Sequence, residues 1–314
     1  MVISIDSGNK NIKTDHFIFP SALNISRVDV GIGEDVLNYK GLCYSATGPR
    51  ISYMRDKTEN DNFYILALIG IAKEIEYAVK NGIEQEKEQY SITLLNGLPP
   101  KHMAQKDKFK NYFLKDETVT FTFNKKEYTV KIENVAIYPQ AYAAAVTQRK
   151  KFKDYPEVLI VDIGGYTIDY MLLNNGVYNP AMCKTLQDGI ITFYDTVVEE
   201  CMAAFDVELS EDEIDEVIKG TNQELIRRLN RIDCNIVTYI YEMTERYVEN
   251  IIYTLKQRGL DLRKVPTIFV GGGSVLLKQY IKRNPLVDRA IFVNDISANA
   301  KGYRILDRIL RKVS

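Results

Sequence analysis

The chain has 314 residues, which is enough for two domains of ordinary size with a substantial core. With 46% hydrophobic and 26% charged residues, its composition is typical of a soluble globular protein. The formal net charge of -1 gives no global basic field to attract nucleic acid, so any link to DNA is expected to run through a partner protein.

Histidine and cysteine, the usual ligands of transition metals in proteins, are scarce in this chain, which argues against a metal centre built from them. Two histidines are too few for a His-based metal centre, and no CxxC pair suggests a zinc site. Free thiols in a reducing cytosol are expected for Cys43, Cys183, Cys201 and Cys234. The N-terminus enters a predicted strand without a signal sequence, and no apolar run approaches the roughly 20 residues of a membrane span. We therefore expect a cytoplasmic protein.

The first half of the chain is predicted to mix strands and helices. A strand hairpin is expected over residues 1–19, and an irregular segment over 20–60 is expected to form a small inserted subdomain. Helices are predicted over residues 61–80, 101–114 and 140–149, and strands over 90–95, 118–123, 127–132 and 135–138. The charged segment 150–156, which ends in proline, is the predicted domain boundary.

The second half repeats this plan. A hairpin is predicted over residues 158–174, followed by a turn into a third strand. Helices are predicted over 190–205, after a capping box at 210–213, over 222–258 as one long helix, and over 275–282 and 298–312; strands are predicted over 267–270 and 290–293. This alternation predicts a mixed-sheet α/β fold used twice. Domain I would contain residues 1–153 and 296–314, and domain II residues 154–295 with a helical subdomain at about 190–260.

One pattern occurs twice and carries most of the functional information. An apolar strand ends in Asp-x-Gly and turns into a second strand, first over residues 2–13 and again over residues 158–169. A glycine-containing turn lets backbone N–H groups approach an anion closely. The Asp at the strand tip, Asp6 or Asp162, then faces the same anion, where it can hold Mg²⁺ or orient a water molecule. The two turns suggest two similar domains that close on the phosphates of one nucleotide, as in a two-domain ATPase.

Other residues fit the same chemistry. Lys13 lies on the return strand after the first turn, which can bring it back toward the phosphates. Gln140 follows a predicted strand and Pro139, where its amide can orient a water molecule. A glycine run follows a strand and opens a helix, so a nucleotide can approach the helix N-terminus closely. The predicted nucleotide-binding residues are Ser7, Gly8, Asn9, Lys10, Asn11, Lys13, Gly164, Gly165, Tyr166, Thr167, Gly189, Gly271, Gly272, Gly273 and Ser274.

Each of these residues also has an ordinary structural explanation. An Asp after a strand often caps a turn, a strand lysine is often only solvated, and Gln140 suits the first turn of any helix. Asp6 alone is ambiguous, and its pairing with Asp162 is what favours function. Gly189 and Arg227 are only candidates for contacts to the base.

The order of the motifs resembles the actin superfamily, which includes actin, bacterial filament proteins, the seventy-kilodalton heat-shock chaperones and the sugar kinases. In that comparison residues 6–13 and 162–169 match the two phosphate loops, and residues 270–274 match the adenosine motif. Residues 140–145 and 298–306 match the two connecting helices. The resemblance implies an α/β fold of two duplicated, ribonuclease-H-like mixed-sheet domains around a nucleotide cleft.

Within that superfamily the chain is similar to the ParM-type plasmid-segregation actins, the StbA-like group. Asn96-Gly97-Leu98-Pro99 resembles a Gly-Leu-Pro segment of the group, and the insertion at 20–60 resembles its reduced upper subdomain. Two positions depart from the pattern: Gln140 stands where many ParM proteins have Glu, and Asn9 stands where Ser or Thr is commoner. Gln140 implies water positioning, as in actin, rather than base catalysis.

The resemblance implies an ATPase that polymerises with Mg²⁺ and ATP, with GTP as the other candidate nucleotide. Its filaments would push or pull plasmid copies apart through a DNA-bound adaptor of the ParR type, and hydrolysis would weaken them. Asp6 would coordinate Mg²⁺ directly or through water, and Asp162 completes the predicted metal site. Asp162 and Gln140 would position the attacking water, while Lys13 and the turn backbones would bind phosphate. No direct contact with nucleic acid is expected.

Two other functions stay open. The first is a non-polymerising, ATP-dependent small-molecule kinase of the same superfamily, in which Asp162 would act as the base. The second is a membrane-tethered scaffold like the division actin FtsA, because residues 305–314 are amphipathic and basic. We favour the packing of Leu306, Ile309 and Leu310 on domain I, and we do not expect membrane binding.

Overall fold

The computed structural model describes residues 1–27, 35–178 and 182–312, and the chain divides into two compact units. Unit 1 contains Met1–Gln148 and Asp295–Ser314, and unit 2 contains Arg149–Asn294. The division lies next to the charged segment 150–156, where the sequence changes from an alanine-rich stretch to lysines and a proline.

Unit 1 is built on a nine-stranded mixed sheet with the order β3-β2-β1-β7-β9-β8-β5-β6-β4. Strand β1 pairs antiparallel with β2 and parallel with β7, which is itself parallel to β9. The strands are β1 (Val2–Ser7), β2 (Asn11–Thr14), β3 (Ile18–Pro20), β4 (Ala22–Ser26), β5 (Val36–Tyr39), β6 (Leu42–Arg50), β7 (Tyr90–Leu98), β8 (Val119–Phe123) and β9 (Lys126–Pro139).

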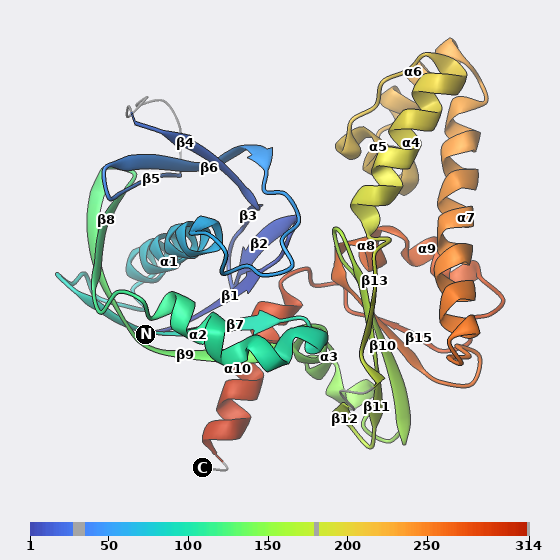
Figure 1. The fold of residues 1–314 in the computed structure, drawn as a ribbon. Coiled ribbons are helices and arrows are strands. Elements are labelled where there is room, and N and C mark those ends of the chain that lie inside the picture. Colours follow the sequence, from blue (N-terminus) through green and yellow to red (C-terminus); the bar gives the residue numbers. More distant parts are fainter. Residues whose placement is uncertain (28–34, 179–181, 313–314) are drawn as a thin grey trace. The chain divides into compact units, whose positions relative to one another are not determined.

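Two helices cover opposite faces of this sheet. Helix α1 (Asn62–Lys80) packs with Ile3 of β1, whereas α10 (Ala298–Arg311) packs on Val2 through Tyr303. Neighbouring strand residues point to opposite faces, so the two helices lie on opposite sides of β1. The sheet bends around α1 (Figure 1), which explains why this helix is apolar on most of its surface. The shorter helices are η1 (Pro100–Gln105), α2 (Lys106–Phe113) and α3 (Tyr142–Val146).

Unit 2 repeats the central part of this topology. Strand β10 pairs antiparallel with β11 and parallel with β14, which is parallel to β15. The order β11-β10-β14-β15 therefore corresponds to β2-β1-β7-β9, which confirms the fold class that the sequence predicts. The strands are β10 (Glu157–Ile163), β11 (Ile168–Asn174), β12 (Val177–Tyr178), β13 (Lys184–Leu186), β14 (Thr267–Val270) and β15 (Ala290–Phe292).

The helices of unit 2 share one apolar core with its sheet. Figure 1 shows α4, α5 and α6 at one end of the sheet, and α7 extending from them along the sheet. The capping box predicted at the start of α5 is present, since Ser210 and Glu213 bond each other's backbone N–H groups. The helices are η2 (Arg149–Lys151), α4 (Ile190–Phe205), α5 (Glu211–Lys219), α6 (Gln223–Ile232), α7 (Ile236–Gln257), α8 (Gly271–Leu276) and α9 (Lys278–Arg283).

The prediction of an irregular segment over residues 20–60 is wrong for much of its length. Strands β4, β5 and β6 extend the sheet of unit 1. A tight turn joins β5 to β6 because Lys40 and Gly41 adopt φ values of 50° and 77°, which suit a two-residue hairpin. Residues 28–34, part of the predicted insertion, lie outside the described residues.

Other element boundaries also differ from the predictions. The expected helix over 222–258 is two helices, because Asp233 is extended and its Oδ1 accepts the Asn235 N–H at 2.8 Å. The helix expected over 140–149 is reduced to α3, since Ala141 precedes it with a φ of 61°. Helix α8 begins at the glycine run itself rather than at Val275, and η1 replaces the first turns of the helix predicted over 101–114.

The first half of the C-terminal helix α10 packs against the rest of unit 1, and its last residues are exposed. Leu306 lies against the cluster around Tyr303, as expected, whereas Ile309 and Leu310 are 40% and 58% exposed, so the packing prediction is wrong for those two. Among the described residues, no helix is both long enough and apolar enough to cross a bilayer.

Candidate functional site

The first candidate half-site is the turn between β1 and β2 in unit 1. Asp6, which is 2% exposed, lies opposite Lys13 in the strand register, and Lys13 Nζ is 3.5 Å from Asp6 Oδ2. The structure therefore brings these two predicted residues together. The N–H of Gly8 donates to the backbone oxygen of Asp6 at 2.9 Å, which tightens the turn. Asn9, Lys10 and Asn11 complete it and are half-buried.

Two side-chain amides hold the Asp6 carboxylate. Gln140 Nε2 donates to Oδ1 at 2.7 Å, and Asn299 Nδ2 donates to Oδ2 at 3.3 Å. Asn299 Oδ1 also accepts the N–H of Ala141 at 2.9 Å, so α10 fixes the segment that carries Gln140. Asn299 was not predicted as a site residue. Its one signal was its position in the stretch that resembles the second connecting helix.

The carbonyl oxygens of the first turn are bonded by residues behind it. Ser21 Oγ donates to the Gly8 oxygen at 2.5 Å, and the Ser21 N–H donates to the Lys10 oxygen at 3.1 Å. Lys57 Nζ donates to the Ser7 oxygen. These bonds satisfy the carbonyls of the turn, so an anion would be bound through N–H groups of the turn. Ser21 and Lys57 belong to no motif, so no sequence pattern predicts either contact.

The second candidate half-site is the turn between β10 and β11 in unit 2. Asp162 lies near the end of β10, opposite Asp169 and beside Val270 of β14. The Gly164 N–H donates to the Thr167 oxygen at 2.9 Å, which closes the turn, and Gly165 and Tyr166 form its half-buried tip. Asp169 accepts hydrogen bonds from the hydroxyls of Thr167 at 3.1 Å and Thr185 at 2.5 Å.

The N-terminus of α4 supports this second turn. The N–H groups of Gly189, Ile190 and Ile191 donate to the carbonyl oxygens of Tyr166, Gly164 and Gly165 at 3.2, 3.0 and 2.9 Å. The N–H of Gly189 is therefore already donated to the turn, at the Tyr166 oxygen, rather than left for a nucleotide. Both turns share this arrangement, in which the carbonyls are bonded from behind, and the motifs alone do not reveal it.

The glycine run lies beside Asp162 because β14 is the parallel neighbour of β10. Gly271 has a φ of 89°, and a Cβ there would lie 2.3 Å from Asp162 Oδ1, so only glycine fits this position. Gly272 is exposed with open space around it, and Gly273 packs against Ile163. Ser274 is fully buried and donates its hydroxyl to the Val270 oxygen, so its side chain points into the helix.

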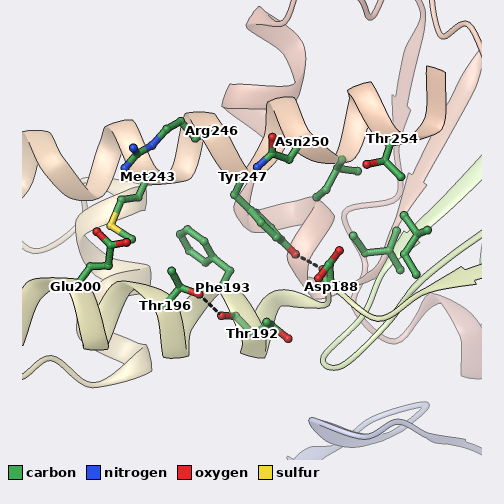
Figure 2. A pocket seen from close by; sticks show the side chains of 13 residues that line it. Asp188, Thr192, Phe193, Thr196, Glu200, Met243, Arg246, Tyr247, Asn250 and Thr254 are labelled. Atoms are coloured by element: carbon green, nitrogen blue, oxygen red, sulfur yellow. Dashed lines mark hydrogen bonds between the residues drawn. The ribbon is translucent and has the colours of Figure 1, made fainter. Parts of the chain in front are cut away.

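A pocket of about 420 Å³ lies between α4 and α7, and none of the predicted nucleotide-binding residues lines it (Figure 2). Phe193 and Tyr247 stack at its centre with ring centroids 4.8 Å apart. The Tyr247 hydroxyl donates to the backbone oxygen of Asp188 at 2.6 Å. Asp188 directly precedes Gly189 in the chain. Burial raises the pKa of Tyr247, which keeps this donor protonated. Tyr247, which lines the pocket, therefore holds the backbone of Asp188, next to the Gly189 N–H that bonds the second turn.

Arg227 lies in a different cavity of unit 2, of about 620 Å³, formed by α5 and α6. Glu216 and Arg231 also line this cavity, and Arg227 Nε donates to the Gln223 oxygen of its own helix at 3.1 Å. Gly189 does not line it. The two candidates for base contacts are thus not brought together by the structure.

The sulfur chemistry agrees with the expectation of free thiols. All the cysteines are free, and Cys183 and Cys201 are buried. Burial, assisted by the nearby negative charge of Asp169, raises the pKa of Cys183 to about 11, so this thiol is protonated at neutral pH.

The donor atoms at the two turns fit Mg²⁺ rather than a transition metal. The described residues contain no group of three or more His, Cys, Asp or Glu side chains placed to hold a metal ion. Carboxylate oxygens at Asp6 and Asp162 suit a hard cation that keeps most of its water. Because both oxygens of Asp6 already accept hydrogen bonds, a contact through a metal-bound water fits Asp6 better than direct coordination.

Comparison with known proteins identifies the family. Residues 4–142 match the family model described as "Actin like proteins N terminal domain", and residues 160–283 match "Archaeal actin homologue MreB-like, C-terminal". The first match contains the turn at Asp6, and the second contains the turn at Asp162. No protein with curated annotation matches the chain by sequence.

Solved structures of actin-like proteins share the fold. Ta0583, an archaeal actin homolog in complex with ADP, superposes with a TM-score of 0.72 at 18% identity over 98% of this chain and 99% of that one. A 15-stranded ParM filament from Clostridium botulinum gives 0.67 at 18% identity over 98% and 99%. Bacillus thuringiensis ParM with AMPPNP gives 0.67 at 12% identity over 98% of each chain. The solved structures show that the fold is shared, and the two family models, which match residues 4–142 and 160–283, identify the chain as an actin-like protein.

Proposed function

We propose that the protein is a filament-forming ATPase whose two turns bind the phosphates of one nucleotide. The observation that carries this proposal is that each turn has an aspartate at its strand tip and carbonyls bonded from behind. Such a turn offers N–H groups to an anion at little reorganisation cost. The actin-like relatives in complex with ADP, AMPPNP or ATP support an adenine nucleotide, with GTP as the alternative.

In this proposal the residues of the chain act mainly by positioning. The turns at Ser7–Asn11 and Gly164–Thr167 would hold phosphates through N–H groups other than those of Gly8 and Gly164, which are donated within the turns, and Lys13 adds positive charge. Asp162, and Asp6 through a water molecule, would hold Mg²⁺, which would supply positive charge against the phosphates. Gly271 and Gly272 leave room for the nucleoside end beside Asp162.

Gln140 is proposed to orient the attacking water together with Asp162. A carboxylate only accepts hydrogen bonds, so the group that Gln140 directs at Asp6 is its NH₂ group. Its Oε1 is then left to accept a hydrogen bond from water. A neutral amide cannot take the proton, and therefore Asp162 is the acceptor we propose for it.

The proposal includes assembly and a biological role. Some actin-like proteins that share this fold form filaments, among them the Alp12 filament and the 15-stranded ParM filament. We propose that this chain also forms filaments with itself in the cytoplasm, that hydrolysis destabilises them, and that they segregate plasmid DNA. A DNA-bound adaptor of the ParR type would supply the contact with DNA, since the net charge of -1 offers none.

Pelleting and negative-stain electron microscopy test this proposal. Purified protein is incubated with Mg²⁺ and ATP, with Mg²⁺ and ADP, or without nucleotide, over a range of protein concentrations. We expect filaments with ATP above a critical concentration and few with ADP. ATP hydrolysis without any concentration-dependent pellet would contradict the filament proposal and favour a non-polymerising kinase of the same superfamily.

A further inference from the structure

We infer that Lys57 is a positioning residue of the first phosphate turn, a role that rests on the proposed nucleotide site. Lys57 lies between β6 and α1, far in sequence from the Asp-x-Gly motif. Its side chain is only 7% exposed, and its Nζ donates to the backbone oxygen of Ser7. The ammonium group also lies 4.9 Å from the centroid of the Phe63 ring. Lys57 therefore places a positive charge directly against the turn.

The direction of this side chain is unusual for a lysine. Burying an ammonium group costs free energy unless it is well hydrogen-bonded, and surface lysines normally keep the charge in water. The neighbouring Asp56 behaves in the ordinary way: it pairs with the exposed Lys108, and that contact lowers the pKa of Asp56 to about 2. Lys57, one residue on, points inward to the turn instead.

Two consequences follow for the turn. The bond from Lys57 fixes the Ser7 carbonyl, as Ser21 fixes those of Gly8 and Lys10, and so holds the turn with its N–H groups toward the phosphates. The charge of Lys57 adds to that of Lys13 beside Asp6. Because a triphosphate carries more negative charge than a diphosphate, and a nucleoside carries none, Lys57 is expected to favour the triphosphate.

The test is to measure the binding of ATP, ADP and adenosine by titration calorimetry with Mg²⁺ for the wild type, Lys57→Met and Lys57→Arg. Methionine keeps an apolar stem against Phe63 but removes the charge and the donor. Lys115→Met is the matched control, because Lys115 also lies over an aromatic ring, 3.9 Å from the centroid of Tyr64, and pairs with Asp61 away from the turn.

We expect Lys57→Met to weaken ATP binding about tenfold or more, ADP binding less, and adenosine binding hardly at all. Lys57→Arg should recover much of the loss, and Lys115→Met should bind like the wild type. Equal weakening of all ligands, or no weakening of ATP binding by a folded Lys57→Met protein, would overturn the inference. ATP and GTP are titrated against the wild type first, and a wild type that binds neither would instead refute the proposed function. This result is separable because it is obtained before any variant is compared.

Discussion

Asp162 is the residue on which the proposed hydrolysis depends most. Replacing it with alanine should leave much of the nucleotide binding intact, because the N–H groups of the turn remain. Phosphate release should fall by roughly 10²-fold or more, as expected when a group that positions or deprotonates water is lost. The filaments should therefore persist. Phosphate release by malachite green assay and filament lifetime by pelleting give the two readouts.

The control for this variant is Asp261→Ala. Asp261 is an aspartate of the same unit that pairs with Arg263 on the surface, away from the turn. Its removal should change neither readout. Release of phosphate by Asp162→Ala at the wild-type rate would show that the assignment of this residue is wrong.

Gln140→Glu tests whether the amide acts by donating to Asp6. The new carboxyl would stand where Nε2 now lies, 2.7 Å from Asp6 Oδ1, and two carboxylates this close raise the pKa of one of them. Below that raised pKa the protonated carboxyl donates to Asp6 as the amide does. Above it, repulsion opens the contact. Phosphate release by the variant should therefore fall as the pH rises through that raised pKa, relative to the wild type measured in parallel.

The opposite slope, or a pH profile identical to that of the wild type, would contradict this role for Gln140. A high-salt measurement serves as a check: because Asp6 is buried, screening should leave the profile nearly unchanged, whereas repulsion between surface charges would be weakened by salt.

At the level of single residues, the sequence was informative only where a motif was local. Asp6 and Lys13 are seven positions apart, and the hairpin register places them together. Asn299, in contrast, reaches Asp6 across 293 positions, and Lys57 reaches Ser7 across 50. No periodicity or spacing signals such contacts, because they depend on how α10 and the β6–α1 connection pack on the sheet.

At the level of elements, the contact between α10 and α3 is tight enough to test. A Cβ on Gly302 would lie 2.0 Å from the backbone oxygen of Ala143. Helix propensity alone predicts that Gly302→Ala stabilises the protein by about 1 kcal/mol. The close approach predicts the opposite sign, a loss of about 1–3 kcal/mol, since backbone must move to make room. Urea unfolding followed by circular dichroism distinguishes the two.

Arg308→Ala is the matched control, because Arg308 is exposed on the same helix. Its effect on the free energy of unfolding should stay within about 0.5 kcal/mol. A stabilised Gly302→Ala protein would mean that α3 and α10 do not approach each other as closely as described.

Element predictions succeeded where the local signals agreed and failed where polar side chains competed with the backbone. Helix α4 and strand β14 have the predicted bounds, since their apolar residues mark both elements, Gly189 precedes α4, and β14 lies between Pro266 and Gly271. The break between α6 and α7 was missed because Asp233 and Asn235 fit the charged face of a helix equally well. Strands β4 and β6 were missed because their burial alternates weakly, and β5 was missed because it is short and Gly41 follows it closely.

At the level of the whole molecule, the duplication was predictable because both copies of the Asp-x-Gly hairpin carry the same strand pattern. The shared order β2-β1-β7-β9 and β11-β10-β14-β15 follows from it, and the actin-like family models agree. Which residues contact other copies of the chain was not predictable. Exposed charged faces such as that of α7 look the same whether they meet solvent or a neighbouring subunit.

The central claim, that nucleotide turnover at the two turns controls assembly, is tested most directly by following 90° light scattering and phosphate release together after Mg²⁺ and ATP are added. The account predicts a rise in scattering above a critical protein concentration, followed by a decay as phosphate appears. Phosphate release with no concentration-dependent scattering would contradict it, and so would scattering that rises equally without nucleotide.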